Sequence, residues 1–248
     1  MTKDSNKAWN RVDSDLSSYN IRQYETKYRS TDFVIKCLKE ELHSDASYNI
    51  LDVGTGGGGN LSYIAQEFPH CSFLGIDINK YFIDMAIAKH NELDISNTDF
   101  KSLDFRDIET EYDIVGSSQF LEVLDMEKAF SFINKCFGSS KTGVYFQALF
   151  TERDLDYEIN IHDKKYYKVV PYNIYSIKSI NKIANSYGFI LKQKKRFIID
   201  VDLPDTHEGR GTYTIKDDKG IRMMFSDVLN LPWYFLYYEK NSTNLKET

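Results

Sequence analysis

The sequence lacks the features that mark membrane, secreted and metal-stabilised proteins. It has no stretch of about 18 uninterrupted apolar residues, which excludes a membrane-spanning helix of ordinary length. The polar first residues have no apolar core of the kind that a secretion signal needs. The three cysteines, Cys37, Cys71 and Cys136, are odd in number and widely spaced, so neither a disulfide framework nor a zinc knuckle is indicated. We therefore expect a cytoplasmic protein with reduced cysteines and no metal site.

Runs rich in serine, glycine or proline are also absent, as is any abrupt change of composition. The 248 residues are enough for one well-cored domain, so we expect a single domain over residues 1–248 that carries insertions. A hydrophobic content of 42% excludes general disorder. The net charge of −6 and the pI of about 5.4 offer little attraction for a polyphosphate chain. We expect no nucleic-acid partner, and either a monomer or a homodimer.

What the sequence does contain is a regular alternation of strand and helix patterns. After a run of glycines, Leu61, Ile64, Ala65 and Phe68 recur at helical spacing, and Pro69 supplies a stop signal. A strict alternation of strands and helices implies a parallel sheet that is covered by helices on both faces. The expected strands are residues 49–53, 71–76, 99–103, 113–116, 143–149, 189–201 and 233–238, and the later helices are 81–91, 120–137 and 173–187.

Three segments do not belong to the alternation. Residues 1–30 are polar, rich in Tyr and Arg and weakly periodic, which predicts an N-terminal arm. Residues 151–172 and 203–231 interrupt the later strands, and we expect both insertions to cover a substrate. Within the second insertion, two strand-like stretches flank a glycine-containing loop at residues 216–220, which is typical of a hairpin.

The glycine run lies where the first strand should turn into a helix. In an open parallel sheet the ligand lies beyond the carboxyl ends of the strands, and glycine lets the backbone approach it closely. The spacing of Gly54, Gly56 and Gly59 also satisfies the dinucleotide-binding fingerprint. The loop alone therefore leaves a nicotinamide-dependent oxidoreductase open as an alternative.

Carboxylates near the strand ends favour a cationic nucleoside ligand. Asp52, directly before the loop, suits a ligand with an ammonium and a sulfonium group, directly or through water, better than it suits a pyrophosphate. Asp77 ends the second strand and is placed for ribose hydroxyls, which both cofactor classes possess. After the third strand, Asp104 can accept from an adenine amino group, and Phe105 can line the face of the ring.

Four motifs in this order resemble the class I S-adenosylmethionine (SAM)-dependent methyltransferases over about residues 30–150. They are Ile50 to Gly58, Gly75 to Asp77, Leu103 to Phe105 and Tyr112 to Leu124. The resemblance implies an α/β three-layer sandwich with a seven-stranded, mostly parallel sheet, an antiparallel last strand and lid insertions. It also implies SAM as cofactor, S-adenosylhomocysteine (SAH) as product, Asp77 at the ribose, Asp104 with Phe105 at the adenine, and Gln119 near the methionine end. The expected cofactor residues are Asp52, Gly54, Thr55, Gly56, Gly58, Asp77, Ile78, Asp104, Phe105 and Gln119.

The sequence departs from the family pattern at one position. Many small-molecule members have Glu-His where this chain has Glu122 and Val123, so a histidine base cannot be carried over there. A base must come from elsewhere or be unnecessary. His162 and His207, one on each insertion, are the candidate catalytic residues. The expected substrate-binding residues are Tyr167, Tyr172, Arg210 and Tyr213.

The insertions also suggest a class of acceptor. Their lysines and arginines suit a phosphate or carboxylate on the substrate. We expect methyl transfer to a hydroxyl of a nucleotide-linked sugar or a similar phosphorylated metabolite. A weaker similarity to enzymes that tailor bacterial surface-polysaccharide (capsule) precursors points the same way. The alternatives are N-methylation of a small molecule, an oxidoreductase, and a non-catalytic module that retains the cofactor fold.

Overall fold

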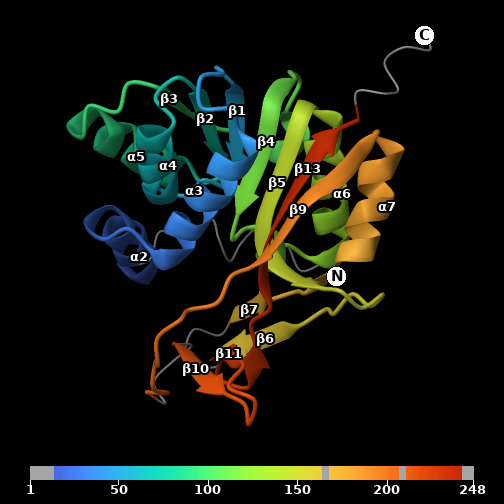
Figure 1. Ribbon diagram of the computed structural model, residues 1–248. Helices are drawn as coiled ribbons and strands as arrows, with labels where there is room; N and C mark the ends of the chain where they lie inside the picture. Colours follow the sequence, from blue (N-terminus) through green and yellow to red (C-terminus); the bar gives the residue numbers. More distant parts are fainter. Residues whose placement is uncertain (1–13, 164–167, 207–210, 242–248) are drawn as a thin grey trace.

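The computed structural model describes residues 14–163, 168–206 and 211–241 (Figure 1). Its centre is an eight-stranded sheet in the order β3-β2-β1-β4-β5-β13-β9, with β8 paired to β5. Strands β1 to β5 are parallel, whereas β13 runs antiparallel to both β5 and β9. Without the two-residue β8, the seven strands of this order confirm the predicted mostly parallel sheet with an antiparallel last strand. The bounds are β1 (Asn49–Val53), β2 (Ser72–Asp77), β3 (Thr98–Ser102), β4 (Tyr112–Ser118), β5 (Ser140–Thr151), β8 (Tyr175–Ser176), β9 (Phe189–Arg196) and β13 (Trp233–Lys240).

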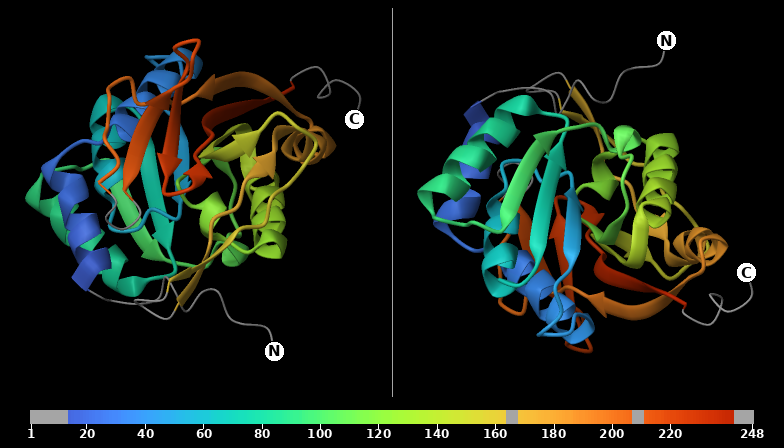
Figure 2. Two further views of the ribbon diagram at one scale, coloured as in Figure 1. Left: turned by 90° about the horizontal axis from the view of Figure 1, so that it is seen from below. Right: turned by 90° about the horizontal axis from the view of Figure 1, so that it is seen from above.

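Helices cover both faces of this sheet, as the end-on views show (Figure 2). One face carries α3 (Arg29–Glu41), α4 (Gly59–Glu67) and α5 (Lys80–Glu92), and the other carries α6 (Met126–Gly138) and α7 (Ile177–Ser186). Each helix buries one apolar stripe, for example Ala129, Phe132, Ile133 and Cys136 on α6. Because both faces are covered, four of the five residues of β1 are buried.

Tertiary contacts set one end of strand β9 and the start of helix α7. Strand β9 stops at Arg196 and not at residue 201, because its pairing partner β13 begins at Trp233, opposite that end. The helix expected from residue 173 begins at Ile177. The residues before Ile177 pair with β5 as strand β8. The buried Asn173 side-chain amide donates to the carbonyl of Leu124. Ile174 exchanges both backbone hydrogen bonds with Tyr157 in an antiparallel bridge, so its carbonyl is not used by a helical hydrogen bond.

Short helices flank the carboxyl ends of the strands. Residues 14–25, within the segment expected to be an arm, form helix α2 (Ser14–Glu25). The 3₁₀ turns η1 (Phe105–Asp107) and η2 (Leu121–Val123) follow β3 and β4. The helix expected from residue 120 therefore begins only at Met126, where the Asp125 side chain accepts from the Lys128 N–H as an N-cap. Within the described residues no helix is long and apolar enough to cross a membrane.

The two insertions form small antiparallel sheets below the main sheet in Figure 1. The first contains β6 (Asn160–Asp163) and β7 (Lys168–Pro171), and the second contains β10 (Thr212–Lys216), β11 (Arg222–Ser226) and β12 (Leu229–Asn230). The predicted hairpin is thus confirmed as β10–β11. In its turn, the Asp217 side chain accepts from two backbone N–H groups, and Gly220 has a φ of +77°.

Candidate cofactor site

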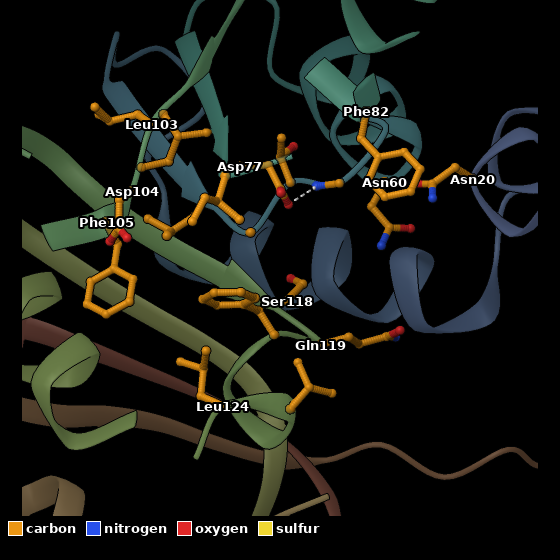
Figure 3. A pocket seen from close by; sticks show the side chains of 18 of the residues that line it. Asn20, Asn60, Asp77, Phe82, Leu103, Asp104, Phe105, Ser118, Gln119 and Leu124 are labelled. Carbon is orange, nitrogen blue, oxygen red and sulfur yellow. Dashed lines mark hydrogen bonds between the residues drawn. The ribbon is translucent and has the colours of Figure 1, made fainter. Parts of the chain in front are cut away.

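A pocket opens beyond the carboxyl ends of β1 and β4 (Figure 3). The chain leaves these neighbouring strands toward opposite faces of the sheet, which makes this edge the switch point of the fold. The pocket is lined by Asn20 and Gln23 of α2, the loop residues Val53 to Gly56, Asn60, Ile76 to Ile78, Phe82, Leu103 to Phe105, Ser118 to Phe120, Val123 and Leu124. The lining therefore includes eight of the ten expected cofactor residues: all except Asp52 and Gly58.

The glycine loop turns sharply from β1 into α4. Gly54, Gly56 and Gly58 have φ values of +77°, +55° and +79°, in the left-handed region where a side chain is disfavoured. The N–H groups of Gly54 and Thr55 donate to the carbonyl of Ile76, which ties the loop to β2. These glycines are therefore required by the path of the backbone, whatever ligand the loop approaches.

Helix α2 packs directly on the same loop. The Gly57 N–H donates to Asn20 Oδ1 at 2.7 Å, and the Tyr24 hydroxyl donates to the Gly57 carbonyl at 2.5 Å. A Cβ on Gly59 would lie 2.4 Å from the Cβ of Gln23. Gly57 and Gly59 thus allow α2 to approach. The loop-facing side of α2 is polar, so a search of residues 1–30 for apolar periodicity does not detect this helix.

Asp77 is anchored at the end of β2. Its Oδ2 accepts from the Gly56 N–H at 3.0 Å, the bond drawn in Figure 3, and its Oδ1 accepts from the Asn79 N–H at 2.8 Å. Partial burial raises the pKa of Asp77, and the backbone bonds from Asn79 and Gly56 act against that shift. The carboxylate is therefore held in one orientation, with lone pairs remaining to accept from a ligand in the pocket.

Asp52 lies behind the pocket and not on its surface. It is 7% exposed on β1, beside Gly116 of β4. Burial raises the pKa of Asp52 to about 6, and the negative charge of Asp77 adds to that shift. Its ionisation therefore changes in the slightly acidic range, and a cation nearby would favour the ionised form.

The opposite end of the pocket is apolar with one carboxylate. Ile78 is 41% exposed, and Leu103 and Phe105 lie on the wall beside it. Phe105 packs edge-to-face on Phe132, with ring centroids 5.2 Å apart. Asp104 accepts from the backbone N–H of Arg106 and pairs with its guanidinium group, which lowers the pKa of Asp104. This end offers apolar side chains and an ionised acceptor.

The wall formed after β4 contains a residue in an uncommon conformation. Gln119 has a φ of +57°, and its N–H donates to the carbonyl of Gln147 on β5. Non-glycine residues rarely adopt a positive φ, and such positions concentrate at functional sites. Figure 3 shows Ser118 and Gln119 across the pocket from Asp77. Asn60, also on the lining, accepts a 2.6 Å hydrogen bond from the Thr31 hydroxyl.

Gly58 faces away from the pocket. A Cβ on it would meet the Tyr24 hydroxyl at 2.8 Å and the Cβ of Ala86 at 2.9 Å. Its carbonyl lies 3.1 Å from His90 Nε2, while Nδ1 of the same ring lies 2.7 Å from Thr98 Oγ1. Burial lowers the pKa of His90, which keeps the ring neutral at pH 7. His90 thus ties the glycine loop to β3, a role that no sequence pattern indicated.

Of the candidate catalytic and substrate residues, the three that the structure describes do not line this pocket. His162 is exposed on β6, opposite Val169, and does not line the pocket. Tyr172 lines a separate cleft between the two small sheets. Tyr213 stacks on Phe225, with ring centroids 5.6 Å apart. His207, Arg210 and Tyr167 lie outside the described residues.

Comparison with known protein families identifies the family of this chain. A family model described as "Methyltransferase domain" matches residues 44–196, which is more than half of the chain. The chain belongs to this methyltransferase family. The matched range includes the glycine loop and the carboxyl ends of β1 to β5 that form most of the pocket.

Solved structures share the fold of this methyltransferase domain. Magnesium protoporphyrin IX methyltransferase from Synechocystis PCC 6803 with bound SAH has a TM-score of 0.65 and 14% identity, covering 96% of this chain and 100% of that one. An O-methyltransferase from a trans-AT PKS multienzyme of Brevibacillus brevis, in complex with S-adenosyl-L-homocysteine, has a TM-score of 0.53 and 14% identity, covering 75% of this chain and 61% of that one. Both agree with SAM as the expected cofactor.

Curated relatives match over a short segment. A tRNA (guanine-N(7)-)-methyltransferase from Synechococcus sp. (strain JA-2-3B'a(2-13)) is 44% identical over 50 residues, which is 20% of this chain and 21% of that protein. A second tRNA (guanine-N(7)-)-methyltransferase, from Rubrobacter xylanophilus, is 33% identical over 66 residues, or 27% of this chain and 30% of that protein. The chain thus matches less than a third of the length of these relatives.

Proposed function

We propose that this protein is a SAM-dependent methyltransferase that transfers a methyl group to a hydroxyl of a small molecule. The observation that carries the proposal is the pocket at the switch point of a methyltransferase domain, with Asp77 anchored to the glycine loop and an apolar slot beside Asp104. Bound SAM supplies an electrophilic methyl group. The chain supplies binding and alignment, and alignment of reacting atoms can lower a barrier by about 7–11 kcal/mol.

The pocket residues divide into two groups along its length. Asp77 accepts from the ribose hydroxyls, while Ile78, Leu103 and Phe105 enclose the adenine and Asp104 accepts from its amino group. At the other end, Gly54, Thr55, Gly56 and Gln119 border the methionine moiety, with Asp52 supplying negative charge behind the loop and Gly58 shaping it. The donors and acceptors in the pocket fit a nucleoside with a positively charged tail.

The charge beside the glycine loop disfavours a nicotinamide dinucleotide. Asp52 comes directly before this loop, where a pyrophosphate would have to bind, whereas Asp77 suits the ribose of either cofactor. A carboxylate at the position of Asp52 would repel that anion and attract an ammonium or sulfonium group. Calorimetric titration with SAH and with NADH tests this directly. We expect SAH to bind and NADH not to bind, and binding of NADH alone would overturn the proposal.

For the acceptor we propose a nucleotide-linked sugar or a similar phosphorylated metabolite. The two small sheets lie beyond the carboxyl ends of the parallel strands, where they can cover such a molecule (Figure 1). The basic residues of the insertions suit its phosphate. The partial matches to tRNA methyltransferases make RNA the competing acceptor, and the net charge of −6 counts against it.

Labelled SAM distinguishes these acceptors. The protein is incubated with labelled cofactor and with separate small-molecule, RNA and protein fractions, and then with purified nucleotide sugars. We expect label in the small-molecule fraction, carried on oxygen, and label confined to RNA or protein would contradict the proposal. Label on nitrogen of a small molecule would instead identify an N-methyltransferase.

A histidine of the insertions is proposed as the base that takes the hydroxyl proton, with His162 the first candidate and His207 the second. General-base catalysis contributes about 10²- to 10⁴-fold, so His162→Ala or His207→Ala should lower kcat by at least about 10²-fold while SAH affinity is unchanged. His43→Ala, an exposed histidine after α3, is the matched control. Full turnover in both insertion variants would remove the histidine base from the mechanism.

A further inference from the structure

Three residues on neighbouring strands lie side by side behind the methionine end of the pocket. Asp52 on β1 is in register with Gly116 on β4, and Gly116 is in register with Tyr145 on β5. Residues in register on adjacent parallel strands project from the same face of a sheet. Asp52 and Tyr145 therefore share the face covered by α3 and α4, with only a glycine between them.

The ring of Tyr145 lies across that glycine. A Cβ on Gly116 would be 2.0 Å from both Cε1 and Cζ of Tyr145 and 2.5 Å from its hydroxyl oxygen. The hydroxyl therefore lies above β4, the strand next to β1, and neighbouring strands are about 4.8 Å apart. Burial, and secondly the negative charge of Asp52, raise the pKa of Tyr145. The phenol thus lies over Gly116, on the face of the sheet that also carries Asp52.

Between Tyr145 and the pocket lie further buried polar atoms without hydrogen-bond partners. Within the described part of the chain, the Tyr145 hydroxyl and both amide atoms of Gln147 are buried without a hydrogen-bond partner. Each of these residues is only 1% exposed. Ser118, in register with Gln147 and part of the pocket lining, also has a buried hydroxyl without a partner. Native proteins rarely leave buried polar groups unsatisfied, so a row of them beside a pocket points to a ligand-dependent network.

We propose that Tyr145 is a positioning residue for the cofactor: with the methionine end bound, its hydroxyl donates to the Asp52 carboxylate and holds it toward the methionine ammonium. This inference rests on the proposed function. Gly116 is the residue that allows the arrangement, because any other side chain would displace the ring. Gln147 and Ser118 extend the network toward the pocket wall.

The arrangement predicts a particular pH dependence. Burial raises the pKa of Asp52 to about 6, the Thr55 hydroxyl acts against that shift, and the Asp77 carboxylate adds to it. A cationic ligand group binds the ionised carboxylate, so affinity for the methionine end should increase as the pH rises through about 6 and level off above it. A donor to the carboxylate favours its ionised form. Removing the Tyr145 hydroxyl should therefore move the midpoint to higher pH.

The experiment compares two ligands that differ in the methionine end. SAH carries the ammonium group, whereas 5′-methylthioadenosine has the same nucleoside and no amino-acid moiety. Their Kd values are measured by calorimetry from pH 5 to pH 8 for the wild type and for Tyr145→Phe. Tyr238→Phe is the matched control, because Tyr238 is buried on the opposite face and donates to Asn181 Oδ1. Asp52→Asn is the second variant.

For Tyr145→Phe we expect SAH binding at pH 7 to weaken about threefold to tenfold, with its pH midpoint raised and methylthioadenosine binding unchanged. Asp52→Asn should lose the transition near pH 6, and Tyr238→Phe should retain the wild-type profile. The inference is overturned if the Tyr145→Phe profile superimposes on the wild type, or if both ligands weaken equally. If the wild type does not bind SAH, the proposed function fails and this inference fails with it.

Discussion

Glu122 on η2 is a carboxyl group in an apolar setting. It is 2% exposed, and burial raises its pKa to about 8. Its Oε2 atom has no hydrogen-bond partner within the described residues. An ionised carboxylate without a partner is costly to bury, so the group remains protonated at neutral pH. Glu122 therefore acts here as a neutral polar residue.

This protonation predicts a stability that decreases with pH. The folded chain holds the Glu122 proton up to about pH 8, whereas the unfolded chain releases it near 4.5, so the free energy of unfolding falls as the pH rises between those values. Glu122→Gln should remove that slope and stabilise the protein by about 1–4 kcal/mol at pH 8, with little effect at pH 5. Urea unfolding at both pH values measures this. The exposed Glu109→Gln is the control, and an equal effect of Glu122→Gln at pH 5 and pH 8 would contradict the interpretation.

At the scale of elements, the contact between α2 and the glycine loop makes a helix part of the pocket wall. Asn20 and Gln23 are buried on the loop and line the pocket at the same time. Two opposing effects meet at Gly59, the first residue of α4. Replacing glycine by alanine in a helix ordinarily stabilises it by up to about 1 kcal/mol, whereas a Cβ here would lie 2.4 Å from Gln23. Such overpacking typically costs about 1–3 kcal/mol, so packing should prevail.

Gly59→Ala is therefore expected to displace α2, lowering stability by about 1–2 kcal/mol and SAH affinity by about tenfold. Hydrogen exchange of residues 14–25 should increase, because their contact with the loop is lost. Gly138→Ala is the matched control, since it also lies in a helix and its Cβ would meet its nearest neighbour, the Tyr187 ring, at an ordinary 3.4 Å. Unchanged exchange in α2 would show that the helix does not depend on this contact.

At the scale of the whole molecule, the pocket joins segments that are far apart in the chain. Its lining extends from Asn20 to Leu124, and the sheet beneath it includes β13 near residue 240. A ligand that binds only the folded state stabilises all of these segments together. If residues 1–248 form one cooperative domain, as the sequence predicts, ligand binding should shift a single unfolding transition.

We expect SAH at about 100 times its Kd to stabilise the fold by about 2.7 kcal/mol and to raise the Tm by about 5–10 °C. Far-UV circular dichroism and tryptophan fluorescence should report the same transition, with and without SAH. Two separate transitions, of which SAH moves only one, would show that the chain contains two domains.

Much of this architecture follows from local sequence patterns. Hydrophobic periodicity and turn chemistry act over a few residues. They predict the helix after the glycine loop, the strands before and after that helix, and the strand ends that carry Asp77 and Asp104. Because parallel strands bring their carboxyl ends to one edge, those local features predict a parallel sheet with a ligand site at that edge. The antiparallel last strand and the place of Gln119 came from the resemblance to the methyltransferase family, whose motifs also narrowed the cofactor to SAM.

Contacts between distant segments could not be read in this way. Two such contacts are the packing of α2 on Gly57 and the placement of the Tyr145 ring over Gly116. For the same reason, the sequence did not show that His162 is not on the pocket lining. The sequence alone determined the glycine turn, the strands next to it and the charged strand ends, because these properties are local. Only the tertiary structure decided which side chains face one another, because strand register and helix docking depend on the packing of the whole chain.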